Sequence, residues 1–339
     1  MTSGSARYPE AATPTTGPTP PGGIVPPALR PSRALRRTAW ALVAAGVAAP
    51  VLRRRMTIPR PVVAAAAWTA PIALCVAVPR SRRRDAATVV LQMWAYLAMY
   101  EMPADDVEAL QARVHIDYPV RADRLLGLGE LIGVRLQRRF ADPPNIRRPE
   151  RVLVWTHWIW FTVPHAAVAY VFVRDRRSFP RAAAMTYATF DLGVLCYWLI
   201  PTAPPWYAAE QGRLGSSDEP LRRLMLDYGE QFWKDRWERL YDGLAGNPLA
   251  AMPSLHFATS VTAAHVLADA GPGAGAIGWL YAGTLGFALV YLGEHYVVDL
   301  LAGLALAEGV RAAEPLAAPV ARRFSAAVQR LELLAKDDR

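Results

Sequence analysis

Long apolar stretches, separated by short arginine-rich segments, limit this chain more than any other feature of its sequence. A helix needs about 20 residues to cross about 30 Å of hydrocarbon, and several stretches reach this length. Because a segment in lipid must satisfy its own backbone hydrogen bonds, we expect each stretch to be helical. The stretches are 38–52, 61–79, 86–103, 152–173, 182–201, 254–270, 275–292 and 296–312.

The sequence therefore predicts an all-α, polytopic transmembrane helix bundle with up to eight crossings. Residues 86–312 would supply a six-helix core, and residues 37–85 would add one or two N-terminal membrane helices. Two more polar segments, 104–151 and 202–253, would lie outside the bilayer. The Pro/Thr-rich residues 1–36 are expected to form a disordered tail without a signal peptide, and residues 313–339 a cytoplasmic tail.

The charge pattern favours a membrane protein over a nucleic-acid-binding protein. The net charge of +9 comes almost entirely from arginine, and the arginines lie at the ends of apolar stretches rather than along one polar face. Cys75 and Cys196 both lie inside apolar stretches, so we expect neither a disulfide framework nor a zinc site. The abundance of Arg, Ala, Gly and Pro is typical of a GC-rich bacterial genome, which favours a bacterial plasma membrane.

Arginine clusters also predict the orientation in the membrane. If the clusters near residues 80–84, 174–181 and 322–323 are cytoplasmic, both polar segments and the turn at 293–295 lie outside the cytoplasm. Arg53, Arg54 and Arg55 disagree with this orientation, because eight crossings would place them outside as well. Within the first polar segment, the run from Ala122 to Phe140 predicts an amphipathic helix on the membrane surface or, alternatively, a soluble cap helix.

The first chemically informative motif is Met252-Pro253-Ser254-Leu255-His256. Ser254 is a favourable N-cap residue, so we expect a helix to start there and His256 to lie in its first turn. Unpaired backbone N–H groups and the positive end of the helix dipole meet at that point, which favours an anion such as phosphate.

The second motif is Gly293-Glu294-His295-Tyr296-Val297-Val298-Asp299. His295 and Asp299 are four residues apart and share a helix face, so the carboxylate can fix the imidazole tautomer. The chain crosses the membrane and returns between the motifs, which brings His256 and His295 to the same side. Two histidines, one of them oriented by a carboxylate, suit nucleophilic catalysis at phosphorus.

Together the motifs resemble those of the type 2 phosphatidic acid phosphatase superfamily, over roughly residues 86–312. Pro201-Thr202-Ala203-Pro204-Pro205, the Leu at 255 and His295-Tyr296-Val297-Val298-Asp299 resemble the inositol phosphorylceramide synthase-type (inositolphosphotransferase) branch. The resemblance implies a six-helix catalytic core, a His295 nucleophile, an orienting Asp299 and a His256 acid and base. It also implies that no metal or organic cofactor is required.

Some positions depart from the phosphatase pattern. Tyr197, Pro204 and Leu289 stand where the phosphatases carry the basic residues that bind phosphate. A transferring phosphoryl group still needs positive charge nearby, so we expect cations from the outer segments. The candidate substrate-binding residues are Arg124, Arg135 and Lys234, together with Ser254, whose simpler role is helix capping.

Several other polar and aromatic residues are expected to have structural rather than catalytic roles. Glu294 could tune His295, but we favour a position on a solvated rim. We expect His265 to be a packed or hydrogen-bonded helix residue. Asp191 could pair with one of the histidines at 157, 165 or 265 inside the bundle. Tyr197, Trp198, Trp206 and Tyr207 are typical of an aromatic belt at the membrane interface.

The leading hypothesis is a metal-independent membrane lipid phosphotransferase acting outside the cytoplasm through a phosphohistidine. It would take phosphate-bearing membrane lipids as donors and an alcohol or lipid as acceptor, with no nucleic-acid partner. Two alternatives remain open. One is a lipid phosphate or polyprenyl-diphosphate phosphatase, with water as acceptor, and the other is a non-catalytic membrane protein of the same fold. Mg²⁺-dependent alcohol phosphatidyl transfer is disfavoured because the helix aspartates are isolated.

Overall fold

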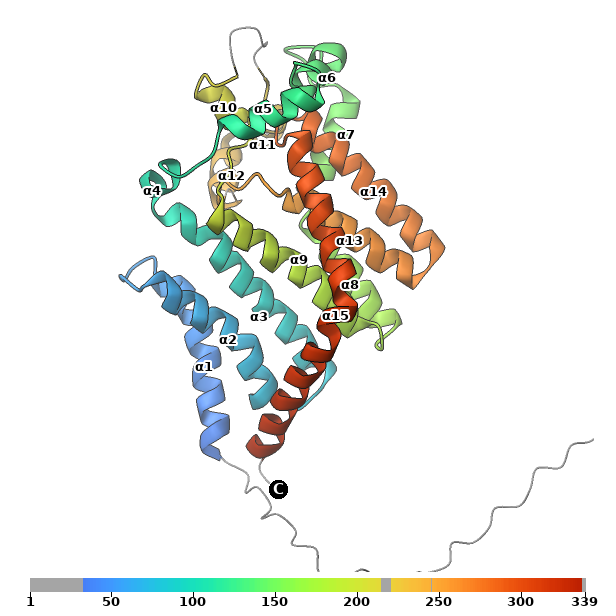
Figure 1. Ribbon diagram of the computed structural model, residues 1–339. Helices are drawn as coiled ribbons and strands as arrows, with labels where there is room; N and C mark the ends of the chain where they lie inside the picture. Colours follow the sequence, from blue (N-terminus) through green and yellow to red (C-terminus); the bar gives the residue numbers. More distant parts are fainter. Residues whose placement is uncertain (1–32, 215–220, 245, 337–339) are drawn as a thin grey trace, which may run out of the picture.

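A computed structural model describes residues 33–214, 221–244 and 246–336, and in these ranges every regular element is helical (Figure 1). The predicted all-α bundle is therefore confirmed. Residues 1–32 of the predicted disordered tail lie outside the described residues. The elements are α1 (Arg33–Leu52), α2 (Arg60–Ala77), α3 (Arg82–Glu101), η1 (Met102–Asp105), α4 (Val107–Gln111), α5 (Asp117–Leu126), α6 (Ile132–Phe140), α7 (Arg148–Trp158), α8 (Thr162–Arg174), α9 (Phe179–Leu199), α10 (Pro205–Glu210), α11 (Leu224–Trp233), η2 (Lys234–Arg236), α12 (Trp237–Leu244), α13 (Leu255–Ala270), α14 (Pro272–Tyr291) and α15 (Val297–Ala335).

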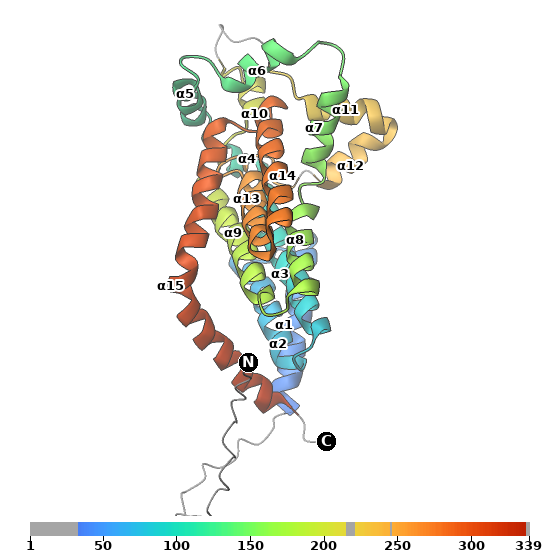
Figure 2. The same ribbon diagram turned by 90° about the vertical axis from the view of Figure 1, so that its right-hand side faces the viewer.

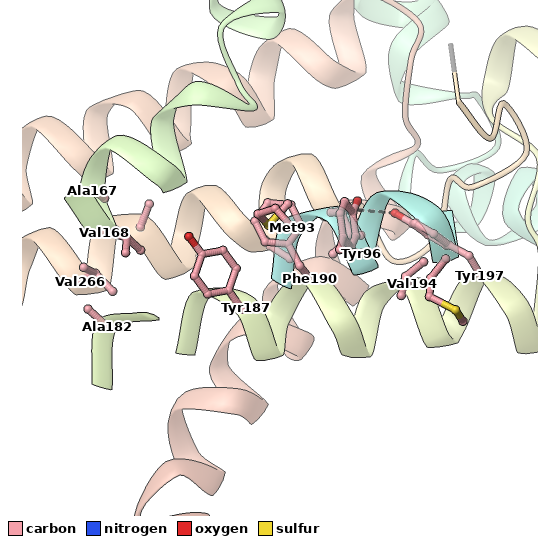
Figure 3. Packing of buried hydrophobic residues seen from close by; sticks show 14 of the residues in the cluster. Met93, Tyr96, Ala167, Val168, Ala182, Tyr187, Phe190, Val194, Tyr197 and Val266 are labelled. Carbon is pink, nitrogen blue, oxygen red and sulfur yellow. Dashed lines mark hydrogen bonds between the residues drawn. The ribbon is translucent and has the colours of Figure 1, made fainter. Parts of the chain in front are cut away.

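Helix α13 is the centre of the bundle and packs against α8, α9, α14 and α15 (Figures 1 and 2). Small residues let the helices approach closely, as where Gly278 of α14 lies against Ala264 of α13. Apolar side chains fill the space between α3, α8, α9 and α13, with Phe190 and Tyr96 in edge-to-face contact (Figure 3). The last residues of α3 and α9 and the first residues of α13 and α15 thus lie toward the same end of the bundle (Figure 1).

All eight apolar stretches form helices. Among the described helices, α1, α2 and α14 are long and apolar enough to cross a membrane by length and composition. The protein is thus an integral membrane protein, and the full number of crossings stays a prediction.

Two stretches predicted as single helices are each interrupted. The stretch 152–173 is two helices, because Pro164 cannot donate to the carbonyl of Trp160 and the chain turns there. The run from Ala122 to Phe140 is also two helices, α5 and α6, since Leu128 and Gly129 adopt positive φ angles of 57° and 102° between them. Helix α1 begins at Arg33, within the range 1–36 predicted as a tail, and α15 continues to Ala335, through most of the predicted C-terminal tail.

The far end of α15 packs against the N-terminal hairpin α1–α2. Ala39, Ala73 and Ala335 share one apolar cluster there. Arg84, at the start of α3, donates to Glu332 of α15 at 3.0 Å, and both side chains are buried. The two ends of the described chain therefore meet on one side of the molecule (Figure 1).

The arginines at 53 and 54, which disagreed with the predicted orientation, are paired with acids. Arg53 is almost fully buried and contacts Glu101 and Asp105, and Arg54 also contacts Glu101. Acidic residues contribute little to the orientation rule, so these ion pairs do not remove the disagreement. They instead fasten the turn between α1 and α2 to the end of α3 and to η1.

The two outer segments meet at Thr202. The His115 amide donates to the Pro201 carbonyl at 2.9 Å, and the Ala251 amide donates to the Thr202 carbonyl at 3.0 Å. These short bridges join the segment after α4, the segment after α9 and the segment that leads into α13. The loop that carries the first motif is thereby anchored on both sides.

Candidate active site

His256 lies in the first turn of α13, as the sequence predicts. Ser254 is the N-cap: it is fully buried, and its hydroxyl accepts from the Phe257 amide at 3.3 Å. The Tyr197 hydroxyl donates to the Pro253 carbonyl at 2.8 Å and accepts from the Leu255 amide at 3.3 Å. Tyr197 is therefore a buried anchor for the motif, and its prediction as an interface-belt residue is wrong.

His295 lies in the turn between α14 and α15. Gly293 allows this turn with φ of +83°, and the Leu289 carbonyl accepts from both the Glu294 and His295 amides at 3.0 Å. Asp299 is fully buried in the first turn of α15. Its Oδ2 lies 3.2 Å from His295 Nδ1 and accepts a hydrogen bond from the Tyr296 amide at 2.9 Å. The predicted His295–Asp299 pair is thus present.

The two motifs meet through their imidazoles. The distance from His256 Nδ1 to His295 Nε2 is 3.2 Å, although the residues are 39 positions apart. Since an ionised Asp299 can only accept, His295 Nδ1 carries a proton and its Nε2 is the unprotonated atom. His256 Nδ1 then holds the proton between the rings, assigned from this hydrogen-bond network. One ring offers a lone pair and the other a proton at the same point.

Two residues near the break between α7 and α8 pack on His256. The Trp160 ring lies 4.1 Å from the His256 ring, and the His157 ring stacks on it at 4.9 Å. Trp160 is held by a 2.9 Å hydrogen bond from its indole N–H to the Thr259 hydroxyl. His157 Nδ1 is buried and has no partner within the described residues. Sequence spacing gave no signal for this third histidine.

Asp123 of α5 supports the His295 turn from the outer side. Its carboxylate accepts from the Val297 amide at 2.8 Å and from the Ile132 amide at 3.2 Å, so it caps both α15 and α6. Burial raises the pKa of Asp123, while these backbone N–H groups act in the opposite direction. The amphipathic outer segment is therefore fastened directly to the helix that carries Asp299.

Glu294 forms a buried ion pair with Arg223, so its prediction as a solvated rim residue is wrong. Arg223 donates from Nε and Nη2 to the two Glu294 oxygens at 3.0 and 3.2 Å, and from Nη1 to the Tyr241 hydroxyl at 2.7 Å. Its guanidinium also lies 4.1 Å from the centre of the Trp206 ring. Burial alone would lower the pKa of Arg223, but Glu294 and Tyr241 raise it overall, so the side chain stays charged.

The three predicted cations have other partners or positions. Arg124 lies close enough to Tyr296 to act on it electrostatically, and it donates to the Leu214 carbonyl. Arg135 contacts Glu130 and the Gly127 carbonyl, and Lys234 is exposed in η2. Their role in substrate binding stays a prediction. Leu289 and Pro204, at positions basic in the phosphatases, are both buried.

Among the other polar residues of the helix bundle, His265 and Asp191 have hydrogen-bond partners, whereas neither ring nitrogen of His165 has one within the described residues. His265 Nε2 lies 2.6 Å from Glu308 Oε1, as expected of a hydrogen-bonded helix residue. Asp191 accepts from Gln92 at 2.7 Å instead of pairing with a histidine. His165 packs among the rings of Phe161 and Phe190. In the described part of the chain, no group of three His, Cys, Asp or Glu residues has the arrangement of a metal site.

A family model described as the PAP2 superfamily matches residues 120–313, more than half of the chain. The chain therefore belongs to the PAP2 superfamily of phosphatases and phosphotransferases, as its motifs suggested. Among curated proteins, it is similar to phosphoinositol dihydroceramide synthase from Bacteroides thetaiotaomicron, with 31% identity over 154 residues. This match covers 44% of the chain and half of the length of that relative. No solved structure is significantly similar.

Proposed function

We propose that this protein is a membrane lipid phosphotransferase that works through a phosphohistidine, with inositolphosphotransferase-like transfer of a phospho-alcohol or phosphoryl group between lipids. The observation that carries the proposal is the His256–His295–Asp299 chain of hydrogen bonds. Within it, His295 is the nucleophile, Asp299 orients it, and His256 is the acid and base. Residues 86–312 form the catalytic unit.

The reaction has two balanced steps. First, His295 Nε2 attacks phosphorus, the bond from phosphorus to the leaving oxygen breaks, and His256 Nδ1 gives its proton to that oxygen. Next, His256 removes the proton from an acceptor hydroxyl, whose oxygen attacks the phosphohistidine and releases His295. The second step restores the starting protonation of both rings, so no other proton donor is needed.

Substrate binding must separate the two rings. A 3.2 Å contact is a direct hydrogen bond and leaves no room for a phosphorus atom with its oxygens between His256 Nδ1 and His295 Nε2. The arrangement is therefore the resting state, in which the proton donor occupies the position that the substrate takes.

Burial of the site supports transfer over hydrolysis. His295 is 5% exposed and Asp299 is fully buried. The neighbouring Tyr296 belongs to one apolar cluster with residues of the outer elements α5, α6 and α10, which lie over the start of α15 (Figure 2). A transferase must keep water from its covalent intermediate, and a covered site serves this purpose. The relative named as a phosphoinositol dihydroceramide synthase also favours a transferase. Its site would face the extracytoplasmic side of a plasma membrane, where the arginine pattern directs the outer segments.

The direct test is trapping of phosphohistidine. Purified protein in detergent is incubated with ³²P-labelled phosphatidylinositol or phosphatidate, with and without ceramide or diacylglycerol. The His295→Asn variant should lose labelling and turnover, while the control His265→Asn, which changes a histidine paired with Glu308, should keep both. Undiminished turnover in His295→Asn would overturn the proposal. Release of free phosphate without any acceptor would favour the alternative, a lipid phosphate phosphatase.

A further inference from the structure

The buried ion pair beside the nucleophile has no role in the mechanism above. Arg223 precedes α11, and Glu294 is covalently next to His295. Four contacts fix the guanidinium: two to Glu294, one to Tyr241 and one face on Trp206. Arg223, Glu294 and His295 all act electrostatically on the His157 ring, which itself stacks on His256. The cation therefore belongs to the neighbourhood of both proposed catalytic histidines.

The segment that carries Arg223 is also held in place. Gln137 of α6 donates to the carbonyls of Arg222 and Tyr291 at 2.8 Å each and accepts from the Arg222 amide at 2.9 Å. A β-carbon on Gly293 would lie 2.7 Å from the Arg222 carbonyl oxygen, so the two segments are in direct contact. The position of Arg223 relative to His295 is thus set by the backbone and not only by its side chain.

Trp206 lies two residues after Pro204, the position at which the phosphatases carry an arginine. Arg223 reaches the Trp206 ring from a separate segment. A cation from elsewhere in the chain therefore stands near the place where the motif arginine is missing.

The guanidinium of Arg223 has N–H donors that its protein partners do not use. A guanidinium has five N–H bonds, and three of them are used by Glu294 and Tyr241. One N–H on Nη1 and one on Nη2 have no protein partner within the described residues. Two donors on one rigid fork match two oxygens of a phosphate.

We propose that Arg223 binds the phosphate of the donor lipid beside His295, and that Glu294 is the positioning residue that holds it there. The proposal rests on the proposed function for the identity of the site. Glu294 also sets the charge at that point, because it cancels most of the charge of Arg223. A phosphate with one negative charge meets two N–H donors and little net field, whereas a second negative charge is repelled by the Glu294 carboxylate.

The test measures anion binding separately from turnover. Glycerophosphoinositol, a singly charged phosphodiester, and glycerol 3-phosphate, mainly a dianion at neutral pH, serve as soluble probes. Their affinities are measured by thermal stabilisation and by inhibition of the labelled-lipid reaction. The variants are Arg223→Gln, Arg223→Lys and Glu294→Gln. Arg222→Gln is the matched control, because it removes the preceding charge, which pairs with Asp227.

Arg223→Gln should weaken both probes roughly 10- to 100-fold, as expected for loss of charge-assisted hydrogen bonds. Arg223→Lys should recover part of this loss, since the ammonium restores charge but not the fork. Arg222→Gln should change neither affinity by more than about 2-fold. Glu294→Gln should favour glycerol 3-phosphate relative to the diester, a change in preference that a purely structural role would not produce.

Unchanged probe affinities in a folded Arg223→Gln protein would overturn the proposal, as would a wild-type protein that binds neither probe. If Arg223→Gln fails to fold, two other measurements test the proposal. Glu294→Gln must shift the preference toward glycerol 3-phosphate, and Arg223→Lys must bind both probes more weakly than wild type; the absence of both changes would overturn the proposal. Failure of the proposed function itself is distinct, because it is read from His295→Asn in the turnover assay whatever the result at Arg223.

Discussion

Gly303 of α15 crosses Ser254 so closely that a β-carbon on Gly303 would lie 2.6 Å from the Ser254 carbonyl oxygen. One turn earlier on α15, the Asp299 carbonyl accepts from the Ser254 amide at 3.0 Å. The helix that carries Asp299 is therefore in backbone contact with the N-cap of the helix that carries His256. This contact, more than any side chain, brings the two motifs together.

We predict that Gly303→Ala pushes α15 away from Ser254. A backbone oxygen cannot rotate aside as a flexible side chain does, so the helices must separate and the His256–His295 contact must lengthen. Activity should fall at least about 10-fold, because small misplacements of catalytic groups are costly, and the melting temperature should fall as well. Turnover and thermal unfolding in detergent measure these effects.

The matched control for that variant is Gly309→Ala on the same helix, where an added β-carbon meets nothing within 4 Å. It should be neutral or stabilising by up to about 1 kcal/mol, since alanine favours helix. Equal losses in both variants would contradict the close-contact explanation.

Asp299→Asn should preserve the fold but lower the turnover number by about 10²- to 10⁴-fold. His295 Nδ1 and the Tyr296 amide share one oxygen of Asp299, Oδ2. An asparagine that keeps its oxygen there loses the negative charge, and one that turns its NH₂ group there favours the His295 tautomer with a protonated Nε2. Single-turnover labelling of His295 measures the loss at the attack step. A variant that labels at the wild-type rate would mean that Asp299 only caps α15.

The ion pair between Arg213 and Asp117 of α5 should stabilise the protein less at acidic pH. The hydrogen bond from Arg213 holds the pKa of Asp117 in α5 below its usual value. The pKa of Asp117 is therefore lower in the folded protein than in the unfolded chain. The ion pair stabilises the fold fully when the pH is above the unfolded-state pKa, and this stabilisation is lost as the pH falls through the folded-state pKa. The melting temperature of wild type minus that of Arg213→Gln should be larger near about pH 7 than near about pH 3. A difference independent of pH would contradict this assignment.

Turnover should persist in excess EDTA. The proposed nucleophile, acid and orienting group are all protein side chains, and the described residues hold no cluster of three metal-ligating side chains. The expected result is a rate within about 2-fold of the rate without chelator, measured with the labelled lipid after dialysis. Loss of activity that is restored by Mg²⁺ alone would contradict a metal-independent mechanism.

Local rules explain why the central site was predictable from the sequence. Ser254 predicts a helix start because serine is a favourable N-cap residue. The four-residue spacing of His295 and Asp299 places them on one helix face, so both features follow from residues that are close in sequence. The Arg223–Glu294 pair joins positions 71 residues apart, and no spacing rule links them. His157 reaches His256 only because the chain turns at 159–161, where the apolar pattern suggested an unbroken helix. Contacts that depend on tertiary packing or on a helix break leave no periodic signal.

The distant end of α15 has a consequence for truncation experiments. Glu332 neutralises the buried Arg84, and removing one partner of such a pair typically costs about 3–5 kcal/mol. From Asp299 to Glu332 the helix runs for about 50 Å, so the Arg84–Glu332 pair and the described ends of the chain beside it lie far from the imidazoles. Activity lost on trimming the N-terminal hairpin or the last turns would thus report failed assembly of the protein, and not a missing chemical group.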